Sequence, residues 1–406
     1  MTMTRLPLTG TRVVDFSWVF AGPTCTLLLS AMGAEVIKIE STTRRDTTRR
    51  LRAYAEGQAQ PVSGGSFDGL NFGKKAITMN LSHPKAVSLV KDLVRVSDIV
   101  VENFSYGVMD RFGLGYQHLQ AIKPDIIMLS FSLFGREGPD KEYFGFGGPL
   151  PVFTGLGSIT GYPGSVPRTV GSSWPDPLNG VSASFAILAA LHHRNKTGEG
   201  QNIDLSMSEG AVTTLPMGVI DYTMNQHVQG PMVNRDPYLV PSGAYRCEGE
   251  DRWVAIAAAD EEQWRSLAKV MGHPEWITDE RFAERLNRKR NEDALDVLIG
   301  QWTQDRDGYE IMQTLQQVGV ACGPTMNRAD LLDDPHLRER GVFVPIQDAL
   351  GNEHPIPGLP FRLSGVPQPD YGKAPGLGEN NRDVFCGILG LSEAEVERLE
   401  QEQILY

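Results

Sequence analysis

The chain has 406 residues, of which 41% are hydrophobic and 22% are charged. These proportions are ordinary for a soluble globular protein and exclude a fibrous or largely disordered chain, and the length favours one large and one smaller domain. The formal net charge of -12 argues against nucleic acid or a membrane surface as a partner, unless a local basic patch overrides it.

One such patch exists, the segment 42-TTRRDTTRRLR-52, which carries five arginines in eleven residues. Guanidinium groups at this density favour a small anionic ligand over a duplex. A solvated charged loop explains the same composition equally well.

The four cysteines, Cys25, Cys247, Cys322 and Cys386, are scattered, with no CxxC pair and no histidine at metal-ligand spacing. We therefore expect neither a disulfide nor a bound metal. The first ten residues lack the apolar core of a signal peptide, and the longest apolar run, about 11 residues, falls short of the ~20 that span a bilayer. These features predict a reduced, cytoplasmic protein.

Short apolar runs alternate with helical patterns over the first 130 residues, which is typical of a parallel α/β sheet. The expected strands are 12–16, 35–40, 76–81, 98–102 and 125–132, and the expected helices are 22–34, 84–96 with Ser82 as N-cap, and 116–122. Functional residues in such sheets lie at the carboxyl ends of the strands. The candidate site loops are therefore 17–23, the residues from Ser41 onward, and 103–107.

The pattern of predicted elements changes twice in the middle of the chain. Residues 143–173 are rich in glycine and are expected to form a loop region, followed by a helix from Gly180 to about Arg194, a strand at 202–207 and a long helix at 208–225.

A break near 228–243 then leads to strands at 244–248 and 253–259, to helices at 261–272, 290–303 and 308–319, and to two amphipathic helices in the tail. We expect residues 1–227 to form the first part of a large domain, 228–345 a small α+β domain, and 346–406 a return to the large domain.

Common catalytic motifs are missing. The turn 15-DFSWVFAGP-23 contains no GxGxxG, and the chain has neither a GxxxxGK[ST] loop nor a GxSxG elbow. His192 and His193 are adjacent on a predicted helix and point about 100° apart, so they are unsuited to hold one metal together. Nucleotide-loop, serine-hydrolase and metal chemistry are all disfavoured.

The stretch 174-WPDPLNG-180 places Asp176 between two prolines, ahead of an apolar run. The following proline makes Asp176 a natural helix N-cap, worth about 1 kcal/mol. The same position suits a nucleophile. The helix dipole should keep a carboxylate of ordinary pKa ~3.9 ionised well below neutral pH, and an ionised carboxylate can attack a thioester. Local sequence leaves capping and catalysis both open.

Several long segments, taken together and in order, resemble the family III CoA-transferases and the related α-methylacyl-CoA racemases. The similarity covers nearly the whole chain and is carried by residues 8–40 with their AGP and GAEVIKIE pieces, Asp46 to Arg49, 71-NFGKKAITMNL-81, 98-DIVVENFSYGVMDRFGLGY-116 and 185-FAILAALHHRNKTGEGQNIDLSMSEG-210. No single segment would suffice.

The resemblance implies an acyl-CoA and a carboxylic acid as substrates, with CoA as a cosubstrate and no resident cofactor. It implies that Asp176 is the nucleophile, forming an aspartyl anhydride and then an aspartyl-CoA thioester. The residues that it places at CoA are Phe20, Ala21, Arg44, Arg49, Lys74, Lys75, Asn103, Phe104 and Arg111.

The same resemblance implies a Rossmann-like α/β large domain built from both chain ends, a smaller α+β domain and an interlocked dimer, either of two copies or of two homologous subunits. Scattered aromatic residues, Phe144, Phe146, Phe153, Tyr162 and Trp174, suggest a bulky or aryl acid as acceptor, although core packing explains them equally well. The chain also resembles the succinyl-CoA:benzylsuccinate CoA-transferases, which implies succinyl-CoA as donor and an aryl-substituted succinate as acceptor.

Several residues depart from the family pattern, and these departures limit the substrates and the reaction type that we expect. Ser41 replaces an arginine, and 248-EGEDRW-253 lacks a glycine-rich loop, so formyl-CoA and oxalate are not expected. Phe146 and Gly147 stand where the racemases carry a His-Asp pair, which disfavours proton exchange between two bases. Two alternatives stay open: a racemase-type isomerase and a non-catalytic subunit of a heteromeric transferase.

Overall fold

The computed structural model describes residues 5–50, 65–145, 147–166, 168–169, 171, 173–347, 351–369 and 371–406. The chain divides into two compact units. The first comprises Met1–Ser158, Pro167–Gln229 and Glu339–Tyr406, and the second comprises Ile159–Val166 and Gly230–Arg338.

A six-stranded parallel sheet forms the centre of the first unit, which confirms the predicted α/β class. Its strands are β1 (Arg12–Asp15), β2 (Glu35–Glu40), β3 (Lys75–Thr78), β4 (Ile99–Glu102), β5 (Ile127–Ser132) and β6 (Asn202–Ser206). They lie in the order β3-β2-β1-β4-β5-β6. The chain leaves β1 toward β2 on one side and later returns to β4 on the other, so a crevice is expected at the carboxyl ends of β1 and β4.

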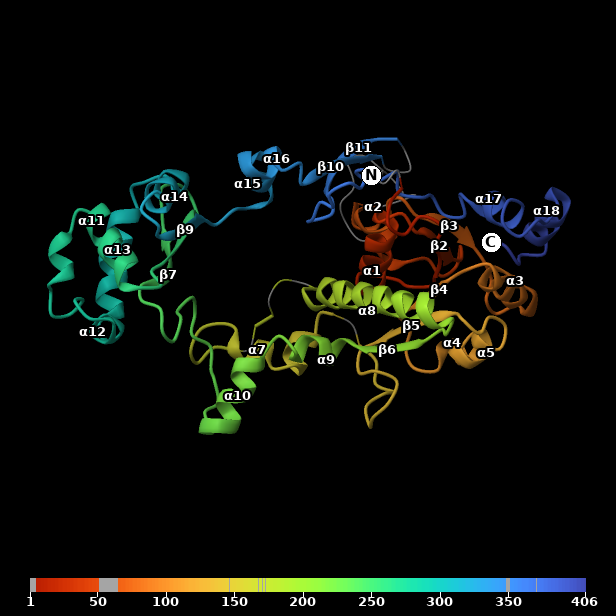
Figure 1. The fold of residues 1–406 in the computed structure, drawn as a ribbon, viewed down its shortest axis with the longest axis horizontal. Helices are drawn as coiled ribbons and strands as arrows, with labels where there is room; N and C mark the ends of the chain where they lie inside the picture. Colours follow the sequence, from red (N-terminus) through yellow and green to blue (C-terminus); the bar gives the residue numbers. More distant parts are fainter. Residues whose placement is uncertain are drawn as a thin grey trace. The chain divides into compact units, whose positions relative to one another are not determined.

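Helices cover both faces of this sheet (Figure 1). Neighbouring strand residues point to opposite faces, and Val13 packs in the cluster with helices α1 (Ala21–Ala31) and α8 (Pro175–Thr197), whereas Val14 packs with α3 (Pro84–Arg95). The C-terminal helices α17 (Asn381–Phe385) and α18 (Glu393–Gln401) cover the same face as α3. Both ends of the chain therefore contribute to this core.

Shorter elements complete the first unit. They are the 3-10 helix η1 (Thr47–Arg50), α2 (Gly65–Asn71), α4 (Val108–Arg111), α5 (Tyr116–Gln120), α6 (Leu150–Phe153), α7 (Leu156–Ile159, which extends one residue into the second unit), α9 (Met207–Val212), α10 (Pro216–Asn225), α16 (Pro335–Glu339, shared with the second unit) and the antiparallel pair β10 (Phe343–Gln347) and β11 (Glu353–Pro357).

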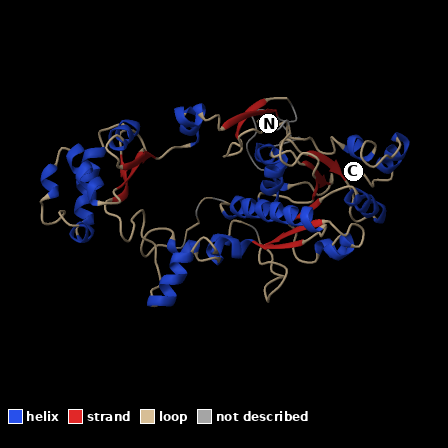
Figure 2. Ribbon diagram, in the orientation of Figure 1, coloured by secondary structure: helices blue, strands red, loops and turns tan. Residues whose placement is uncertain are grey.

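The second unit packs helices on a small antiparallel sheet (Figure 2). Its strands are β7 (Ser242–Arg246), β8 (Trp253–Ala257) and β9 (Ala321–Pro324), in that order, and its remaining elements are α11 (Glu261–Val270), η2 (Pro274–Ile277), α12 (Arg285–Arg290), α13 (Glu292–Thr303), α14 (Gly308–Gln316) and α15 (Arg328–Asp333). Trp264, Phe282 and Leu295 are fully buried in its core.

Four local expectations were wrong. Helix α8 begins at Pro175 rather than at Gly180, because proline is well tolerated in a first turn. The helix expected over 208–225 is two helices, and the second starts at Pro216. His83, not Ser82, caps α3 by accepting a hydrogen bond from the Lys85 amide. Strands β9, β10 and β11 were not predicted; each contains a proline, which weakens the sequence signal for a strand.

All four cysteines are free thiols. Within the described ranges, we find no group of three or more histidine, cysteine, aspartate or glutamate side chains able to hold a metal ion. None of the helices in those ranges combines the length and the apolar character needed to cross a bilayer.

Candidate active site

Asp176 lies in the first turn of α8, but it does not cap the helix. The N-cap is Trp174, which makes no side-chain cap hydrogen bond, and the amide of Asp176 donates to the Ser173 carbonyl at 3.1 Å. Of the two roles that the sequence left open for Asp176, capping is therefore excluded. The carboxylate is not used to complete the helix.

Burial sets the charge state of this carboxyl group. Asp176 is 6% exposed, and desolvation raises its pKa to about 6. The described part of the chain gives the carboxylate no hydrogen-bonding or ionic partner. The expectation that the helix dipole would hold this pKa low was wrong, because burial outweighs the dipole. At pH 7 the group is still about nine-tenths ionised.

Two glycines allow the backbone to pack closely around Asp176. A Cβ added to Gly147 would lie 1.7 Å from Oδ2 of Asp176, so only glycine leaves room there for the carboxylate. One turn along α8, a Cβ on Gly180 would lie 2.7 Å from the Thr24 Cβ and 2.8 Å from the Ala21 carbonyl oxygen in α1. Helix α8, which carries Asp176, therefore packs closely against the first turn of α1.

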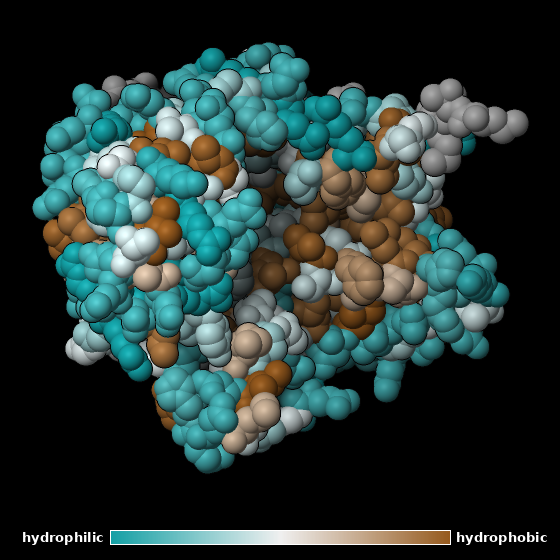
Figure 3. Space-filling view, turned by 60° about the vertical axis from the view of Figure 1, so that its left-hand side comes forward, coloured by the Kyte–Doolittle hydropathy of each residue, from teal (hydrophilic) through white to brown (hydrophobic). Residues whose placement is uncertain are grey.

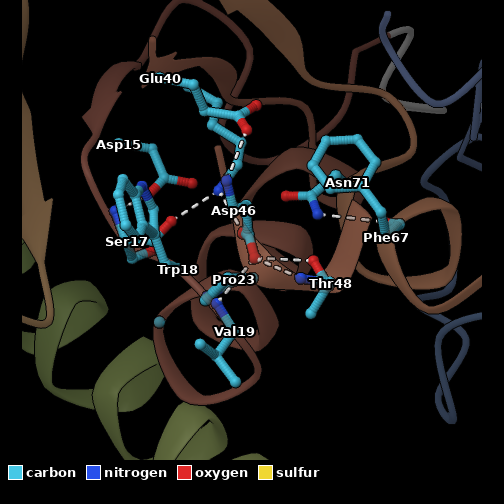
Figure 4. Close-up of polar contacts among 12 residues, drawn as sticks. Asp15, Ser17, Trp18, Val19, Pro23, Glu40, Asp46, Thr48, Phe67 and Asn71 are labelled. Carbon is cyan, nitrogen blue, oxygen red and sulfur yellow. Dashed lines mark hydrogen bonds and ion pairs between the residues drawn. The ribbon is translucent and has the colours of Figure 1, made fainter. Parts of the chain in front are cut away.

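The turn after β1 is held by side chains from neighbouring strand ends (Figure 4). The Asn103 amide group accepts a hydrogen bond from the Trp18 N–H at 2.8 Å and donates to the Trp18 carbonyl at 2.7 Å. Lys38 donates to the Ser17 carbonyl at 2.6 Å, and Asp46 accepts from the Val19 N–H at 3.2 Å. The geometry of this turn is therefore fixed at the switch point of the sheet.

Three ion pairs with buried partners lie behind this turn. Lys38 pairs with Asp46 at 3.0 Å, and both side chains are fully buried. Arg49 holds Glu40 through two nitrogens and stacks 3.5 Å above the Phe67 ring. Buried pairs are specific in geometry because a lost partner leaves an uncompensated charge.

The third pair is Lys74 with Asp15, at 3.5 Å. Burial lowers the pKa of Lys74 to about 8. Its ammonium group also donates to the Thr26 hydroxyl at 2.7 Å and to the Asn71 side chain at 2.9 Å. The N–H groups of Lys74 are therefore used by acceptors within the protein.

A cleft of about 330 Å³ opens beside the turn, over the carboxyl ends of β1 to β4. Five aromatic residues line it, together with the cationic side chain of Arg44 and several hydroxyl groups. The aromatic residues are Phe16, Trp18, Phe104, Phe112 and Tyr406, and the hydroxyl residues are Ser41, Thr43, Ser82 and Ser105. Such a cleft can stack a planar base and bind anionic groups.

The residues that the sequence assigned to CoA fall into two groups. Arg44 and Phe104 line the cleft, and Phe20 and Ala21 form the start of α1. Arg111 is exposed at the end of α4, with its guanidinium beside Gly107.

The other four assigned residues contact protein groups instead. Arg49 and Lys74 are buried in ion pairs, and Asn103 binds the backbone of Trp18. Lys75 begins β3 and bonds to Glu35 at 2.8 Å, at the amino edge of the sheet. The structure does not bring the two lysines to the cleft.

Sequence reasoning missed several residues of the site. Trp18 and Tyr406 line the cleft although they are 388 positions apart, and no local pattern links them. Lys38 lies in the strand segment KIE, 38–40, and its side chain is fully buried. A lysine inside a strand of a buried sheet could have been recognised as a member of an internal ion pair.

The aromatic residues taken as a sign of an aryl acceptor have different surroundings where the structure describes them. Phe153 packs on Phe134 at 6.1 Å between ring centroids, Phe144 is 87% exposed, and Tyr162 belongs to the second unit. Trp174 adjoins Asp176 in sequence as the N-cap of α8. Phe146 lies outside the described residues.

Comparison with known proteins gives matches over nearly the whole chain. The model of CoA-transferase family III matches residues 8–381. The chain is 33% identical to a succinyl-CoA–D-citramalate CoA-transferase of Chloroflexus aurantiacus over 98% of both chains. It is 29% identical to the beta subunit of succinyl-CoA–L-malate CoA-transferase of the same organism, over 100% of this chain and 99% of the relative. A crystal structure of a CAIB/BAIF family protein from Brucella suis matches with a TM-score of 0.85 and 30% identity, over 95% of this chain and 100% of the other.

Proposed function

The chain belongs to CoA-transferase family III, and from this premise we propose that Asp176 is the acyl-accepting nucleophile of a transferase that uses succinyl-CoA as donor. The protein is a CoA-transferase acting between an acyl-CoA and a carboxylic acid. The observation that carries the proposal is a buried carboxylate that has no polar partner among the described residues and has a glycine against its Oδ2.

The proposed reaction proceeds in four displacements. The Asp176 carboxylate attacks the thioester carbonyl of the donor, which forms an aspartyl anhydride and expels CoA thiolate. The thiolate attacks the Asp176 carbonyl, which releases succinate and forms an aspartyl-CoA thioester. The acceptor carboxylate then attacks that thioester and again expels the thiolate, which finally attacks the acceptor's carbonyl. The products are the new acyl-CoA and a regenerated Asp176 carboxylate.

The properties of Asp176 suit these steps. Desolvated carboxylates are more nucleophilic than hydrated ones, since less water must be removed for attack, and a pKa of about 6 leaves most of the group ionised at neutral pH. Gly147 lies against Oδ2 of Asp176, and the absence of a side chain there lets the carboxylate keep its position.

We further propose that the cleft over β1 to β4 holds the adenosine and phosphate part of CoA. Arg44 supplies the cation for the phosphates, and Trp18, Phe104 and Tyr406 supply faces for the purine. We propose Arg111, Phe20 and Ala21 as further residues that contact CoA. Arg49 and Lys74 support the loops of the cleft from behind.

The donor assignment rests on the relatives, two of which carry succinyl-CoA in their names. Those relatives are named for D-citramalate and L-malate, so the proposed acceptor is a dicarboxylic acid. An aryl-substituted succinate remains in the set to be assayed, beside aliphatic dicarboxylates. A cytoplasmic location stays a prediction.

We also propose that two chains associate as an interlocked dimer, of two copies or of homologous subunits. Helix α10 supports association because none of its residues is buried. Its exposed apolar residues are Met217, Val219, Ile220, Tyr222 and Met224, with exposed fractions of 49–76%. Figure 3 shows apolar side chains at the surface on one face of the molecule. Monomers rarely leave such a helix uncovered.

One experiment tests the nucleophile. The enzyme turns over with an acceptor labelled with ¹⁸O in its carboxylate, and the peptide that contains Asp176 is then weighed by mass spectrometry. The mechanism predicts one labelled oxygen in Asp176 after a single turnover, because the bridging oxygen of the second anhydride stays with the side chain, and up to two labelled oxygens after many turnovers. Unlabelled peptide from an enzyme that has completed many turnovers contradicts the proposal.

The two alternatives give different results. A racemase incorporates solvent deuterium at the α-carbon of an acyl-CoA without any acceptor acid. A non-catalytic subunit leaves turnover intact in the assembled complex when Asp176 is replaced by alanine.

A further inference from the structure

Val19 has an uncommon backbone conformation. Its φ is 70°, in the left-handed region, where a β-branched side chain is a genuine outlier. Such strain persists only where the surroundings hold the residue in place, and it is concentrated at functional sites. The residue follows Trp18, which lines the cleft, and precedes the start of α1.

The surrounding side chains account for this conformation. Asp46 Oδ1 accepts from the Val19 N–H at 3.2 Å, and its Oδ2 pairs with Lys38, whose ammonium donates to the Ser17 carbonyl at 2.6 Å. Trp18, between them, is held at both backbone groups by Asn103. Each of the three turn residues is thus bonded through its backbone to a side chain from another segment.

Asp46 is itself immobilised. Its Oδ1 also accepts from the Thr48 N–H at 3.0 Å and from the Thr48 hydroxyl at 2.7 Å, and its own N–H donates to Glu40 at 2.9 Å. Its side chain is fully buried. The restraint on Val19 therefore comes from a fixed point of the structure.

The turn determines where α1 begins, and α8 rests on that beginning. Gly180 packs against Ala21 and Thr24, and one turn farther the Ser184 hydroxyl donates to the Cys25 carbonyl at 3.4 Å. The contacts advance in the same direction along both helices, so their first turns lie at the same end. Asp176 has no polar partner in the described part of the chain, so its place depends on this packing.

We propose that Asp46 and Lys38 are positioning residues for the transfer reaction, which hold Val19 in its left-handed conformation and so set the place of α1 and of Asp176 above it. This inference rests on the proposed function. It predicts an effect on the rate of acyl transfer that is separate from the stability of the fold.

The first test is Val19→Pro, with Val233→Pro as the matched control. Val233 is also a valine with left-handed φ, at 61°, but it lies in the second unit. Proline cannot adopt a positive φ and has no N–H to donate to Asp46, so both variants should lose some stability, while only the first disturbs the turn before α1. In the folded Val19→Pro enzyme we expect kcat to fall by at least tenfold, since a misplacement of about 1 Å costs up to 10²-fold. KM for succinyl-CoA should stay within about twofold because Asn103 still holds Trp18, and Val233→Pro should keep the wild-type kcat.

The second test compares two double variants that both lack the buried charges. Lys38→Met/Asp46→Asn keeps an oxygen acceptor for the Val19 N–H, whereas Lys38→Met/Asp46→Leu, of similar size, does not. The leucine variant should have at least tenfold lower kcat than the asparagine variant at a temperature well below both melting temperatures. If neither double variant folds, the two proline variants still decide the question.

A wild-type kcat in Val19→Pro would overturn the inference, as would an equal loss in Val233→Pro. The proposed function fails separately, through the absence of label in Asp176 of the wild-type enzyme. The comparison of kcat between the variants measures the positioning role whether or not Asp176 becomes labelled.

Discussion

A Cβ on Gly147 would lie only 1.7 Å from Oδ2 of Asp176, so the glycine backbone and the carboxylate occupy adjacent space with no room for a methyl group. We therefore expect Gly147→Ala to displace the carboxylate and to lower kcat by roughly 10²-fold, the cost of about 1 Å in reacting geometry. Steady-state kinetics with succinyl-CoA and circular dichroism of the folded variant provide the measurements.

The control is Gly300→Ala. Gly300 lies inside α13, and no atom lies within 4 Å of its added Cβ. Alanine there should raise the unfolding free energy by up to about 1 kcal/mol and leave kcat unchanged. A Gly147→Ala enzyme of wild-type activity would show that the carboxylate tolerates displacement, contrary to the proposed role.

The activity should depend on pH through Asp176. Only the ionised carboxyl attacks the thioester, and burial raises its pKa to about 6. We expect kcat/KM for succinyl-CoA to be level above about pH 7 and to fall about tenfold per unit well below pH 6. The 3′-phosphate of CoA titrates near pH 6 as well, so the profile should be repeated with a dephospho-CoA thioester. A profile that loses its break with that donor would assign the titration to the substrate.

The same buried charge should make the enzyme less stable than its neutral variant. The folded-state pKa of Asp176, about 6, lies above the ordinary value of 3.8. Its contribution to folding is therefore complete below about pH 3.8 and is lost as the pH rises through about 6. A shift of roughly two units corresponds to about 3 kcal/mol. Asp176→Asn should be more stable than the wild type by about this amount at pH 8, and by about half of it at pH 5.

Chemical denaturation at pH 5, 6.5 and 8 measures this difference. The exposed Asp305→Asn serves as the control and should show no such trend. Equal stability of Asp176→Asn and the wild type at all three values would mean that the carboxylate finds a compensating partner in solution.

Periodicity predicted strands β1 to β5 and helices α1, α3 and α5 because each carries a local apolar pattern, whereas the short elements η1, α2 and α4 were not predicted. Val13 and Val14 illustrate this, since alternate strand residues enter opposite cores. The start of α8 was placed five residues late because the apolar pattern begins only after Gly180, whereas the helix already includes the two prolines Pro175 and Pro177 in its first turn.

The site itself was only partly predictable. Asp176 was found through the resemblance and its place before an apolar helix, but its pKa depends on burial that no local pattern reveals. Lys74 was assigned to phosphate because exposed and buried lysines look alike in sequence. Its actual partners, Asp15 and Asn71, are brought near by the tertiary fold.

Arg44 should contribute to CoA binding rather than to chemistry. It is the arginine that lines the cleft of about 330 Å³, so Arg44→Ala should raise KM for succinyl-CoA about tenfold and leave kcat within twofold. The loss should shrink at high salt, which screens the exposed charge. Arg95→Ala is the control, because Arg95 ends α3 ahead of β4 and lies toward the amino edge of the sheet. A matching increase in KM in both variants would point to a general charge effect.

The exposed helix α10 leads to the last prediction. Its apolar residues need a covering surface, and an interlocked partner provides one that cannot leave without unfolding. Light scattering should give twice the chain mass, and mixing tagged with untagged protein should give no hybrid dimers until both are unfolded and refolded together.

Ile220→Glu should leave refolded protein largely monomeric, since it places a charge on a face that the partner would desolvate. Leu286→Glu, at a residue 61% exposed in the second unit, is the matched control and should refold to the wild-type mass. Rapid hybrid formation in native buffer would exclude interlocking while leaving ordinary association in place, whereas a monomeric wild type would exclude both.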